Sequence, residues 1–494
     1  MTNTNSTPDL RAMARQAMMD AGLVPDFPPE VIHELRSLNQ TIPPTLEMDS
    51  IKDLRALLWS SIDNKESKDL DQVEYVERLP DGSLRILIGI ADVDAFVPKE
   101  SAIDHHAFVN TVSVYTPAII FPMLPEQLST GITSLLEGED RLAVIIDLVM
   151  MNDGEISSKQ VYRALVRNRA KLTYEEVGEW LEGRATIPDG VTKVVGLEAQ
   201  ISLQNEATEW LRALRRRNGA LELETVESVP VLSGGEVVGL EVKRHNRAQD
   251  IIESFMVAAN TSMAEYLESK GVPSLRRVVR TPERWSRIVD LARSMGENLP
   301  TKPNSRALAD FLVRRRQAEP EHYPELSLSV LKLLGSGEYR VEAPGLEQEG
   351  HFGLAVHDYT HSTAPNRRYP DLVTQRSLKA SIAGNDPPYT RTELEAIAER
   401  CNRMEDAARK VERTMRKAAA AVLLHKHIGE VFEGIVTGVT PKGTFARLID
   451  PPAEGRIIEG ERGLDVGDRI RVRLLSTNPE RGFIDLARLG SDKK

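Results

Sequence analysis

Apolar residues recur at helical spacing near the start of the chain. This spacing predicts one helix over residues 10–21, which begins after Asp9 and ends at Gly22, and a second over residues 30–38, which follows two prolines. We therefore expect a small helical N-terminal unit over residues 1–48, a candidate helix-turn-helix.

Residues 49–426 mix strand and helix patterns without a repeat or a low-complexity break. Alternating apolar positions over residues 73–79 and 83–93 predict two β-strands joined by the turn Pro80-Asp81-Gly82. Longer segments have the apolar spacing of helices, over residues 193–217, 250–270, 282–295 and 392–425. This mixture predicts an α+β domain.

The last segment, residues 427–494, has a different pattern. Short alternating runs separated by Gly, Pro, Asp and Asn predict a small all-β barrel, with strands over residues 431–437, 443–449, 469–475 and 482–486. The segment is similar to the oligonucleotide-binding barrel, or OB fold, at Gly434, Val436, Gly443-Thr444-Phe445 and Gly467-Asp468. Such barrels stack bases on aromatic rings of one open face. Phe445 is the candidate platform, and a place in the barrel core is the alternative.

Length and composition narrow the class of protein. With 494 residues, of which 41% are hydrophobic, the chain is long enough for two or more domains. The longest apolar runs fall well short of the ~20 residues that cross a bilayer, and the first 22 residues lack the apolar region of a signal peptide. We expect a cytoplasmic protein that does not contact membranes. Cys401 is the only cysteine, so an internal disulfide and a cysteine-rich zinc site are excluded, and a metal must be held by oxygen or histidine.

The net charge of -11 argues against a protein that coats nucleic acid non-specifically, because neutralising phosphates needs clustered lysine and arginine. Local basic clusters nevertheless occur at residues 215–217, 276–280, 314–316, 367–368 and 410–417. Taken one at a time, each is more typical of a solvated helix face.

The most informative segment is the acidic loop, residues 61–72, which places Asp63, Asp69 and Asp71 just before a strand. Like charges at this density repel, so a divalent cation or an opposite charge is needed to compensate them. Carboxylates suit Mg²⁺, which prefers hard oxygen ligands and keeps waters for substrate phosphates. A solvated turn is the alternative for an acidic loop taken alone.

A calcium loop of the EF-hand type is excluded by spacing. Counted from Asp63, a loop of that type would end on Glu74. Lys65 and Lys68 would then stand where the loop needs an oxygen ligand and a glycine.

The acidic loop resembles the active site of the ribonuclease II and ribonuclease R family, whose catalytic domain carries an Asp, five residues, then Asp-x-Asp-Asp. Asp63, Asp69 and Asp71 match this pattern, and Gln72 replaces the fourth aspartate with a neutral oxygen ligand at best. Further matches follow in order at residues 90–93, 115–125, 171–176 and 351–372. The resemblance implies an exoribonuclease catalytic domain over residues 49–426, followed by an RNA-binding OB-fold barrel.

The resemblance also implies roles for residues outside the loop. Residues 359–372 match a family signature whose arginine contacts the scissile phosphate, which is Arg367 here. Tyr174 matches a tyrosine that stacks on the 3′-terminal base, and Leu223 falls where the family has the second ring of that stack. Tyr115 matches the aromatic residue that limits the short bound segment at its other end.

Two glutamates match family positions along the RNA. Glu253 corresponds to a glutamate near the terminal ribose, and Glu412 to a helix glutamate beside the RNA path. A salt bridge on a helix surface is the alternative for both.

The function implied by the resemblance is that of a 3′-to-5′ exoribonuclease in RNA degradation and processing. It implies a monomer that hydrolyses single-stranded RNA to nucleoside 5′-monophosphates with Mg²⁺, for which Mn²⁺ is a substitute. The family usually carries two cold-shock barrels before the catalytic domain, whereas about 48 residues precede it here, so we expect the C-terminal barrel to supply a larger share of RNA affinity.

Two other classes of function stay open at this point. Gln72 makes a non-catalytic RNA-binding protein on the same fold conceivable. The N-terminal helical unit makes a regulator conceivable, with that unit contacting nucleic acid or a protein and the nuclease as a secondary function.

Overall fold

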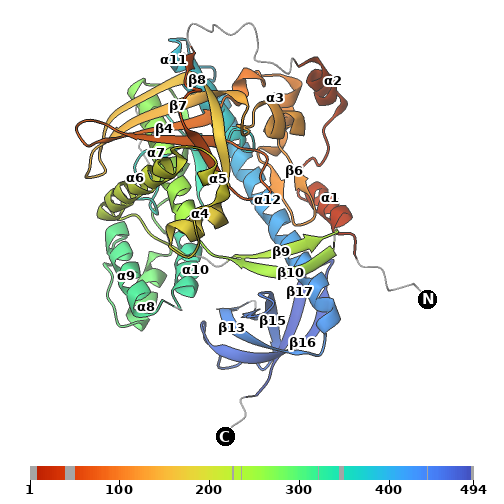
Figure 1. The fold of residues 1–494 in the computed structure, drawn as a ribbon. Coiled ribbons are helices and arrows are strands. Elements are labelled where there is room, and N and C mark those ends of the chain that lie inside the picture. Colours follow the sequence, from red (N-terminus) through yellow and green to blue (C-terminus); the bar gives the residue numbers. More distant parts are fainter. Residues whose placement is uncertain are drawn as a thin grey trace.

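The computed structural model describes residues 8–38, 51–224, 227–234, 236–320, 322–343, 350–441 and 443–490. A body of mixed helices and strands is joined by a long helix to a small barrel near the C-terminus (Figure 1). The predicted fold class, an α+β body with N-terminal helices and a C-terminal barrel, is confirmed. Across these described ranges, every helix is too short or too polar to cross a membrane.

The two predicted N-terminal helices are confirmed as α1 (Leu10–Asp20) and α2 (Pro29–Ser37). Asp9 caps α1 by accepting hydrogen bonds from two backbone N–H groups of its first turn. The buried face of α1 packs on the long helix α12 (Arg391–Leu424), and α2 packs on α3 (Ala102–Asn110). Both helices are therefore docked on the body, while the predicted boundary at residue 48 lies outside the described residues.

A six-stranded sheet with the order β1-β8-β2-β3-β4-β7 forms the centre of the body. Its strands are β1 (Lys52–Asp53), β2 (Trp59–Asp63), β3 (Gln72–Arg78), β4 (Leu84–Ala91), β7 (Asp140–Met150) and β8 (Ile156–Thr173). β8 also pairs with β7, which closes the sheet on itself. The predicted hairpin is confirmed as β3 and β4, although β4 ends at Ala91 because a short 3₁₀ turn begins at Val93.

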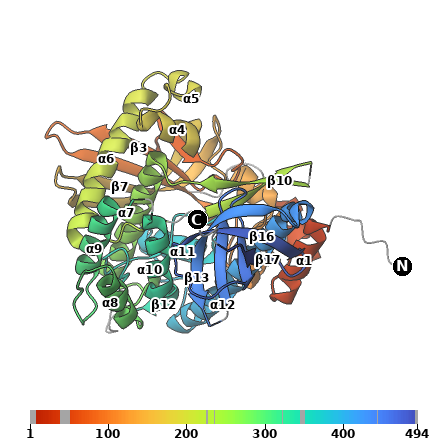
Figure 2. The ribbon, with the colours of Figure 1, turned by 90° about the horizontal axis from the view of Figure 1, so that it is seen from below.

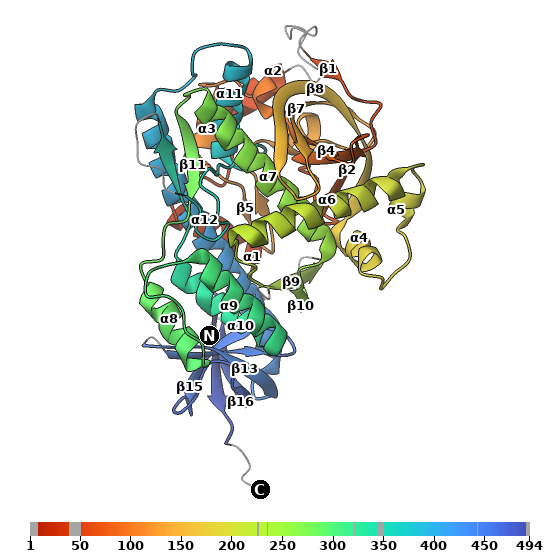
Figure 3. The same cartoon turned by 90° about the vertical axis from the view of Figure 1, so that its left-hand side faces the viewer.

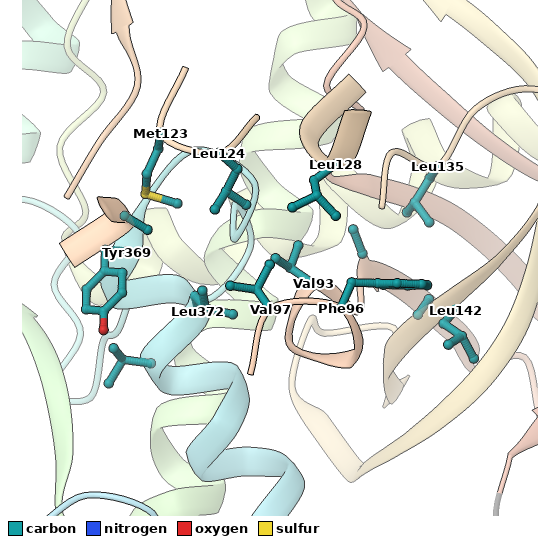
Figure 4. Packing of buried hydrophobic residues seen from close by; sticks show 14 of the residues in the cluster. Val93, Phe96, Val97, Met123, Leu124, Leu128, Leu135, Leu142, Tyr369 and Leu372 are labelled. Carbon is teal, nitrogen blue, oxygen red and sulfur yellow. The ribbon is translucent and has the colours of Figure 1, made fainter. Parts of the chain in front are cut away.

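Helices cover both faces of this sheet. One face packs on α4 (Tyr174–Leu181), α5 (Asp189–Thr192), α6 (Leu197–Asn218) and α7 (Arg247–Ser269). The other face packs on α3, α11 (Tyr369–Ile382) and α12. Figure 4 shows part of this second core, in which Val97 lies beside Leu372 of α11 and Phe96 points toward Leu142 of β7.

Three helix starts differ from their predictions by three or four residues. α8 (Trp285–Ser294) begins at Trp285 instead of residue 282, and the other two differ for local reasons. α6 begins at Leu197 instead of residue 193 because Gly196 has a left-handed conformation, with φ of 87°, that interrupts the helix. α7 begins at Arg247, ahead of the predicted residue 250, because Asn246 and Gln249 form a capping box.

Three further helices form a separate small core on one side of the body (Figure 3). They are α8 (Trp285–Ser294), α9 (Ser305–Ala318) and α10 (Tyr323–Leu334). The remaining strands make antiparallel pairs, β5 (Val114–Tyr115) with β6 (Ile120–Phe121), β9 (Glu227–Ser233) with β10 (Glu236–Lys243), and β11 (Ser274–Val278) with β12 (Glu338–Glu342). The last pair brackets α8, α9 and α10 in the sequence.

The C-terminal strands form a closed barrel in the order β13-β14-β15-β17-β16 (Figure 2). They are β13 (Val431–Thr440), β14 (Gly443–Leu448), β15 (Glu454–Glu459), β16 (Arg469–Asn478) and β17 (Phe483–Arg488), of which β15 was not predicted. Ala420, Ala421 and Leu424 of α12 pack into the barrel core. The long helix therefore fixes the barrel to the body.

Candidate active site

The acidic loop connects β2 to β3, which are neighbouring antiparallel strands of the main sheet. Asp63 is the last residue of β2, and Gln72 is the first residue of β3. Ser134 fastens the loop, because its hydroxyl donates to the Lys68 carbonyl at 2.6 Å and accepts from the Leu70 N–H at 2.9 Å. The loop is therefore held against the sheet at both its middle and its ends.

Asp71 joins the acidic loop to the distant arginine signature. Its side chain is 2% exposed. One carboxylate oxygen accepts from the Asn366 backbone N–H at 3.0 Å, and the other accepts from Arg367 Nε at 3.1 Å. Burial raises the pKa of Asp71 to about 7, and the positive charge of Arg367 opposes that rise. The two motifs selected separately in the sequence thus meet at one carboxylate.

The other two aspartates differ in their surroundings. Asp63 is buried, and Gln72 Nε2 donates to its Oδ1 at 3.4 Å. Its second oxygen, Oδ2, has no hydrogen-bond partner among the described residues. Burial raises the pKa of Asp63 to about 6. Asp69 is more exposed, and its Oδ2 accepts from the Tyr115 hydroxyl at 2.8 Å.

The donor set at the acidic loop fits a divalent cation. Carboxylates and an amide oxygen are the hard ligands that Mg²⁺ and Mn²⁺ accept. The partnerless Oδ2 of Asp63 is a buried atom that a cation would satisfy. These features are consistent with the metal dependence expected of such a site.

A tighter acidic group lies elsewhere. Within the described ranges, Glu268, Glu342 and Asp358 are the residues that bring three carboxylate oxygens within 4.8 Å of one another. The aspartates of the acidic loop are therefore more widely spread. Arg276 contacts Glu342 and lies 3.7 Å from Asp358, so positive charge is already present in the tighter group.

Arg367 has a fixed backbone and a guanidinium that is partly exposed. Its carbonyl accepts from the Ser113 N–H at 3.0 Å, and its Nε is held by Asp71. The side chain is nevertheless 43% exposed. A guanidinium held on one edge and open on the other can present its remaining N–H groups to a phosphate.

Tyr115 and Glu412 form one connected unit with the acidic loop. Glu412 of α12 accepts a hydrogen bond from the Tyr115 backbone N–H at 2.9 Å, and the Tyr115 hydroxyl reaches Asp69. The structure therefore places Glu412 behind Tyr115, where it positions this aromatic ring relative to the acidic loop.

The other residues predicted to contact RNA lie in different parts of the body. Tyr174 begins α4 and packs against the core under α6 and α7, close enough to Asp63 for that charge to raise the pKa of the tyrosine further after burial. Leu223 packs on the α8–α10 core. Glu253 lies 3.3 Å from Arg215, which is the surface ion pair considered as its alternative.

A cavity of about 1430 Å³ connects several of these residues. Its wall includes Asn64 of the acidic loop, Tyr115, Leu223 and Glu253. It continues past α6 and β10 to the barrel, where Ile435, Leu448 and Arg469 line it. Basic side chains are frequent along the wall, at Arg212, Arg215, Arg216, Lys243, Arg244, Arg247, Arg316, Arg447 and Arg469. The wall also carries Glu182, Glu222, Glu224, Asp250, Glu253 and Glu325, several of which form ion pairs with these arginines. Nine basic residues against six acidic ones leave an excess of positive charge, which suits a polyanion.

Phe445 lies on the outer face of the barrel. Burial alternates along β14, with Thr444, Ala446 and Leu448 inside and Phe445 half-buried on the other side. Arg447, on the same face two residues later, lines the cavity and forms an ion pair with Glu325 of α10 at 2.8 Å. The face that carries Phe445 thus continues the basic wall.

Sequence reasoning missed three residues of the site. Asn366 holds Asp71 through its backbone, and Ser134 fastens the loop from a segment with no recognisable motif. Glu74 is fully buried beside the loop, and burial together with the Asp63 charge raises its pKa well above the ordinary value. Only Asn366 left a signal, since it lies beside Arg367 within the signature over residues 359–372.

The RNB domain family matches residues 51–384, which is more than half of the chain. The chain belongs to this ribonuclease family. A second family, the C-terminal S1 domain of ribonuclease II-type exonucleases, matches residues 430–489 and so covers the barrel. The resemblance stated from the acidic loop and the arginine signature, and the class of enzyme it implies, are thereby confirmed.

Named relatives and solved structures agree with this placement. Ribonuclease R of Thermotoga maritima is 31% identical over 500 residues, covering 95% of this chain and 69% of that protein. Ribonuclease R 1 of Lactococcus lactis is 28% identical, covering 96% of this chain and 60% of that protein. In fold, the chain matches Mycoplasma genitalium RNase R in complex with ribose-methylated single-stranded RNA, with a TM-score of 0.84 at 23% identity over 97% of this chain and 78% of that one. It also matches yeast Ssd1, a pseudonuclease, with a TM-score of 0.70 at 16% identity over 90% of this chain and 55% of that one.

Proposed function

We propose that this protein hydrolyses single-stranded RNA from its 3′ end and releases nucleoside 5′-monophosphates. The observation that carries the proposal is the double contact of Asp71 with Asn366 and Arg367, which joins acidic ligands for a cation to an arginine for a phosphate. Membership of the RNB family and the named ribonuclease R relatives support it.

The acidic loop would hold the cation. Asp63, Asp69 and Asp71, with the Gln72 amide oxygen, would bind Mg²⁺, for which Mn²⁺ is a substitute. A divalent cation bound there would make a water more nucleophilic and stabilise the leaving oxygen. Asp71 has a second task in this arrangement, because its other contacts fix the backbone and side chain of the arginine signature.

Arg367 would neutralise the phosphate as negative charge develops on it. Its Nε is occupied by Asp71 and its outer edge is exposed, so the guanidinium is oriented before RNA arrives. A donor fixed in advance costs no reorganisation at the moment of reaction.

The basic cavity would guide one RNA strand from the barrel to the acidic loop. Tyr174 would stack on the last base, and Glu253 would lie near the last ribose. Tyr115, supported by Glu412, would limit the bound segment at its other end. Base stacking tolerates any sequence, whereas the 2′-hydroxyl distinguishes RNA from DNA.

End-labelled RNA tests this function. We expect a 3′-labelled oligoribonucleotide to lose its label at once as a mononucleotide, and a 5′-labelled one to shorten stepwise, in both cases only with Mg²⁺ or Mn²⁺ added. Loss of the 5′ label first, or cleavage within the strand, would reject the proposed direction.

Two observations favour the non-catalytic alternative. Gln72 lacks the charge of the family's fourth aspartate, and a pseudonuclease shares the fold. Such a protein would bind both labelled oligomers and release no nucleotide from either. The regulatory role of the N-terminal helices, the monomeric state and the cytoplasmic location stay predictions.

Leu223→Phe tests the predicted stack against Tyr174. A second ring should tighten binding of a short oligomer by about 1 kcal/mol, or roughly fivefold. The dissociation constant is measured with an inactive Asp71→Asn background so that the RNA stays intact. Val242→Phe, which adds a ring to the β10 part of the cavity wall, should leave this affinity unchanged. Equal effects of both variants would mean that Leu223 does not face the terminal base.

Phe445→Ala tests the contribution of the barrel. Loss of one base stack, worth about 1 to 3 kcal/mol, should raise KM for long RNA by about 5- to 150-fold and leave a short oligomer unaffected. A point substitution is preferable to deleting the barrel, because α12 packs into the barrel core. Phe483→Ala removes an exposed ring from β17 of the same barrel and serves as the matched control. Equal loss on long and short RNA would contradict this division of labour.

A further inference from the structure

Glu74 is a carboxylate buried inside the main sheet. It lies in the middle of the sheet, opposite Ser60 of β2 and Ile88 of β4, and its exposed fraction is 0%. Neither of its carboxylate oxygens has a hydrogen-bond partner among the described residues. Burying an unpaired carboxylate is costly, so a group in this state needs a compensating charge or a proton.

The position of Glu74 relates it to the acidic loop. Residues two apart on a strand point to the same face, so Glu74 lies on the same face of β3 as Gln72. Gln72 in turn donates to Asp63, and Asp63 is close enough for its charge to act on Glu74. Glu74 therefore adds a carboxylate to the inner side of the acidic loop, behind the neutral Gln72.

Asp63 is a second buried carboxylate with an unsatisfied oxygen. It is also nine-tenths buried, and its Oδ2 has no partner among the described residues. Neighbouring carboxylates with bare oxygens repel each other unless something positive lies between them. The charge of Lys171 lowers the pKa of Asp63, but its Nζ donates to the Lys65 carbonyl, and Arg367 is held by Asp71.

We propose that Glu74 is the carboxylate that completes the divalent-cation site of this chain, holding the ion together with Asp63 and compensating for the neutral Gln72. The proposal rests on the proposed function, because it assigns a further ligand to the same catalytic cation. It also implies that ion binding draws the side chains of the site closer together than they are in the free protein.

Glu74→Gln tests the assignment, because it keeps the size of the side chain and removes only its charge. We expect the affinity for Mn²⁺, titrated by calorimetry into the full-length protein without RNA, to fall at least tenfold. The melting temperature in EDTA should stay the same or rise, because an unpaired buried charge is removed, while the rise in melting temperature on adding Mn²⁺ should be lost. A purely structural role for Glu74 would give the opposite pattern, with a lower melting temperature in EDTA and a normal Mn²⁺ response.

Two further variants sharpen the test. Glu77→Gln, on the same strand but paired with Arg85 at 3.0 Å, should bind Mn²⁺ as the parent does. The double variant Gln72→Asp with Glu74→Gln moves the fourth carboxylate back to the loop and should recover most of the lost affinity. Glu74→Asp keeps the charge but shortens the side chain, so it should weaken Mn²⁺ binding several-fold even if Glu74→Gln does not fold.

Parental Mn²⁺ affinity in Glu74→Gln or in Glu74→Asp would overturn the proposal. That result would leave the proposed function standing if Asp71→Asn still abolished cleavage. If Glu74→Gln kept its Mn²⁺ binding and Asp71→Asn kept its cleavage activity, both this proposal and the proposed function would be rejected.

Discussion

Arg367→Gln is expected to lower kcat on a short oligoribonucleotide by about 10²- to 10³-fold, the usual cost of removing one preorganised donor from a developing anion. The substitution removes the positive charge from the exposed end of the side chain. The expected change in KM is small, because RNA affinity comes from many contacts along the basic cavity.

Arg367→Lys separates charge from geometry. Lysine keeps the positive charge but cannot donate to Asp71 through an Nε–H while presenting a planar edge to the phosphate. We therefore expect it to recover only part of the lost kcat. Arg244→Ala, which removes a basic side chain from the cavity wall, is the control and should affect KM alone. If Arg367→Gln raised KM and left kcat intact, the arginine would be a binding residue without a role in the chemical step.

The elements with a strong local pattern could be predicted from the sequence. The β3–β4 hairpin follows from apolar alternation on both sides of the Pro80-Asp81-Gly82 turn, and α12 follows from its long amphipathic pattern. β8 was missed because apolar and polar residues do not alternate regularly in its polar first half. Its extent depends instead on its partners in the fold, which are β7 along most of its length and β2 near its end. β15 is short and has only two adjacent isoleucines, so its place depends on barrel closure.

The candidate site likewise has features that the sequence shows and features that only the fold shows. The acidic loop is visible as a density of like charges, and Arg367 is visible only through the family resemblance. Their meeting at Asp71 spans 295 residues and is a property of the fold, which no local pattern contains. Glu74 reads as an ordinary polar position on a strand, and its missing partners become apparent only when its neighbours are in place.

Asp71→Asn is expected to have the largest effect of any single substitution. It keeps the shape of the side chain, removes one negative charge from the cation site, and replaces one of two acceptor oxygens with a donor. The Asn366 N–H and Arg367 Nε both need an acceptor there, so the arginine is displaced as well. Two catalytic elements are thus damaged together, and we expect kcat to fall on the order of 10³-fold or more.

RNA binding should survive the same substitution. Affinity is spread over the basic cavity and the barrel, and removing a negative charge reduces repulsion of the phosphates. Asp81→Asn, in the exposed turn of the hairpin, is the matched control and should leave both rate and affinity at the parental values.

The decisive measurement is single-turnover cleavage of a short 5′-labelled oligoribonucleotide by Asp71→Asn, made beside the dissociation constant of the same oligomer on the same preparation. If the acidic loop and the arginine signature form one catalytic centre, the cleavage rate falls on the order of 10³-fold or more while the dissociation constant stays within about threefold of the parental value. Cleavage by Asp71→Asn at close to the parental rate would show that the chemistry takes place elsewhere in the molecule.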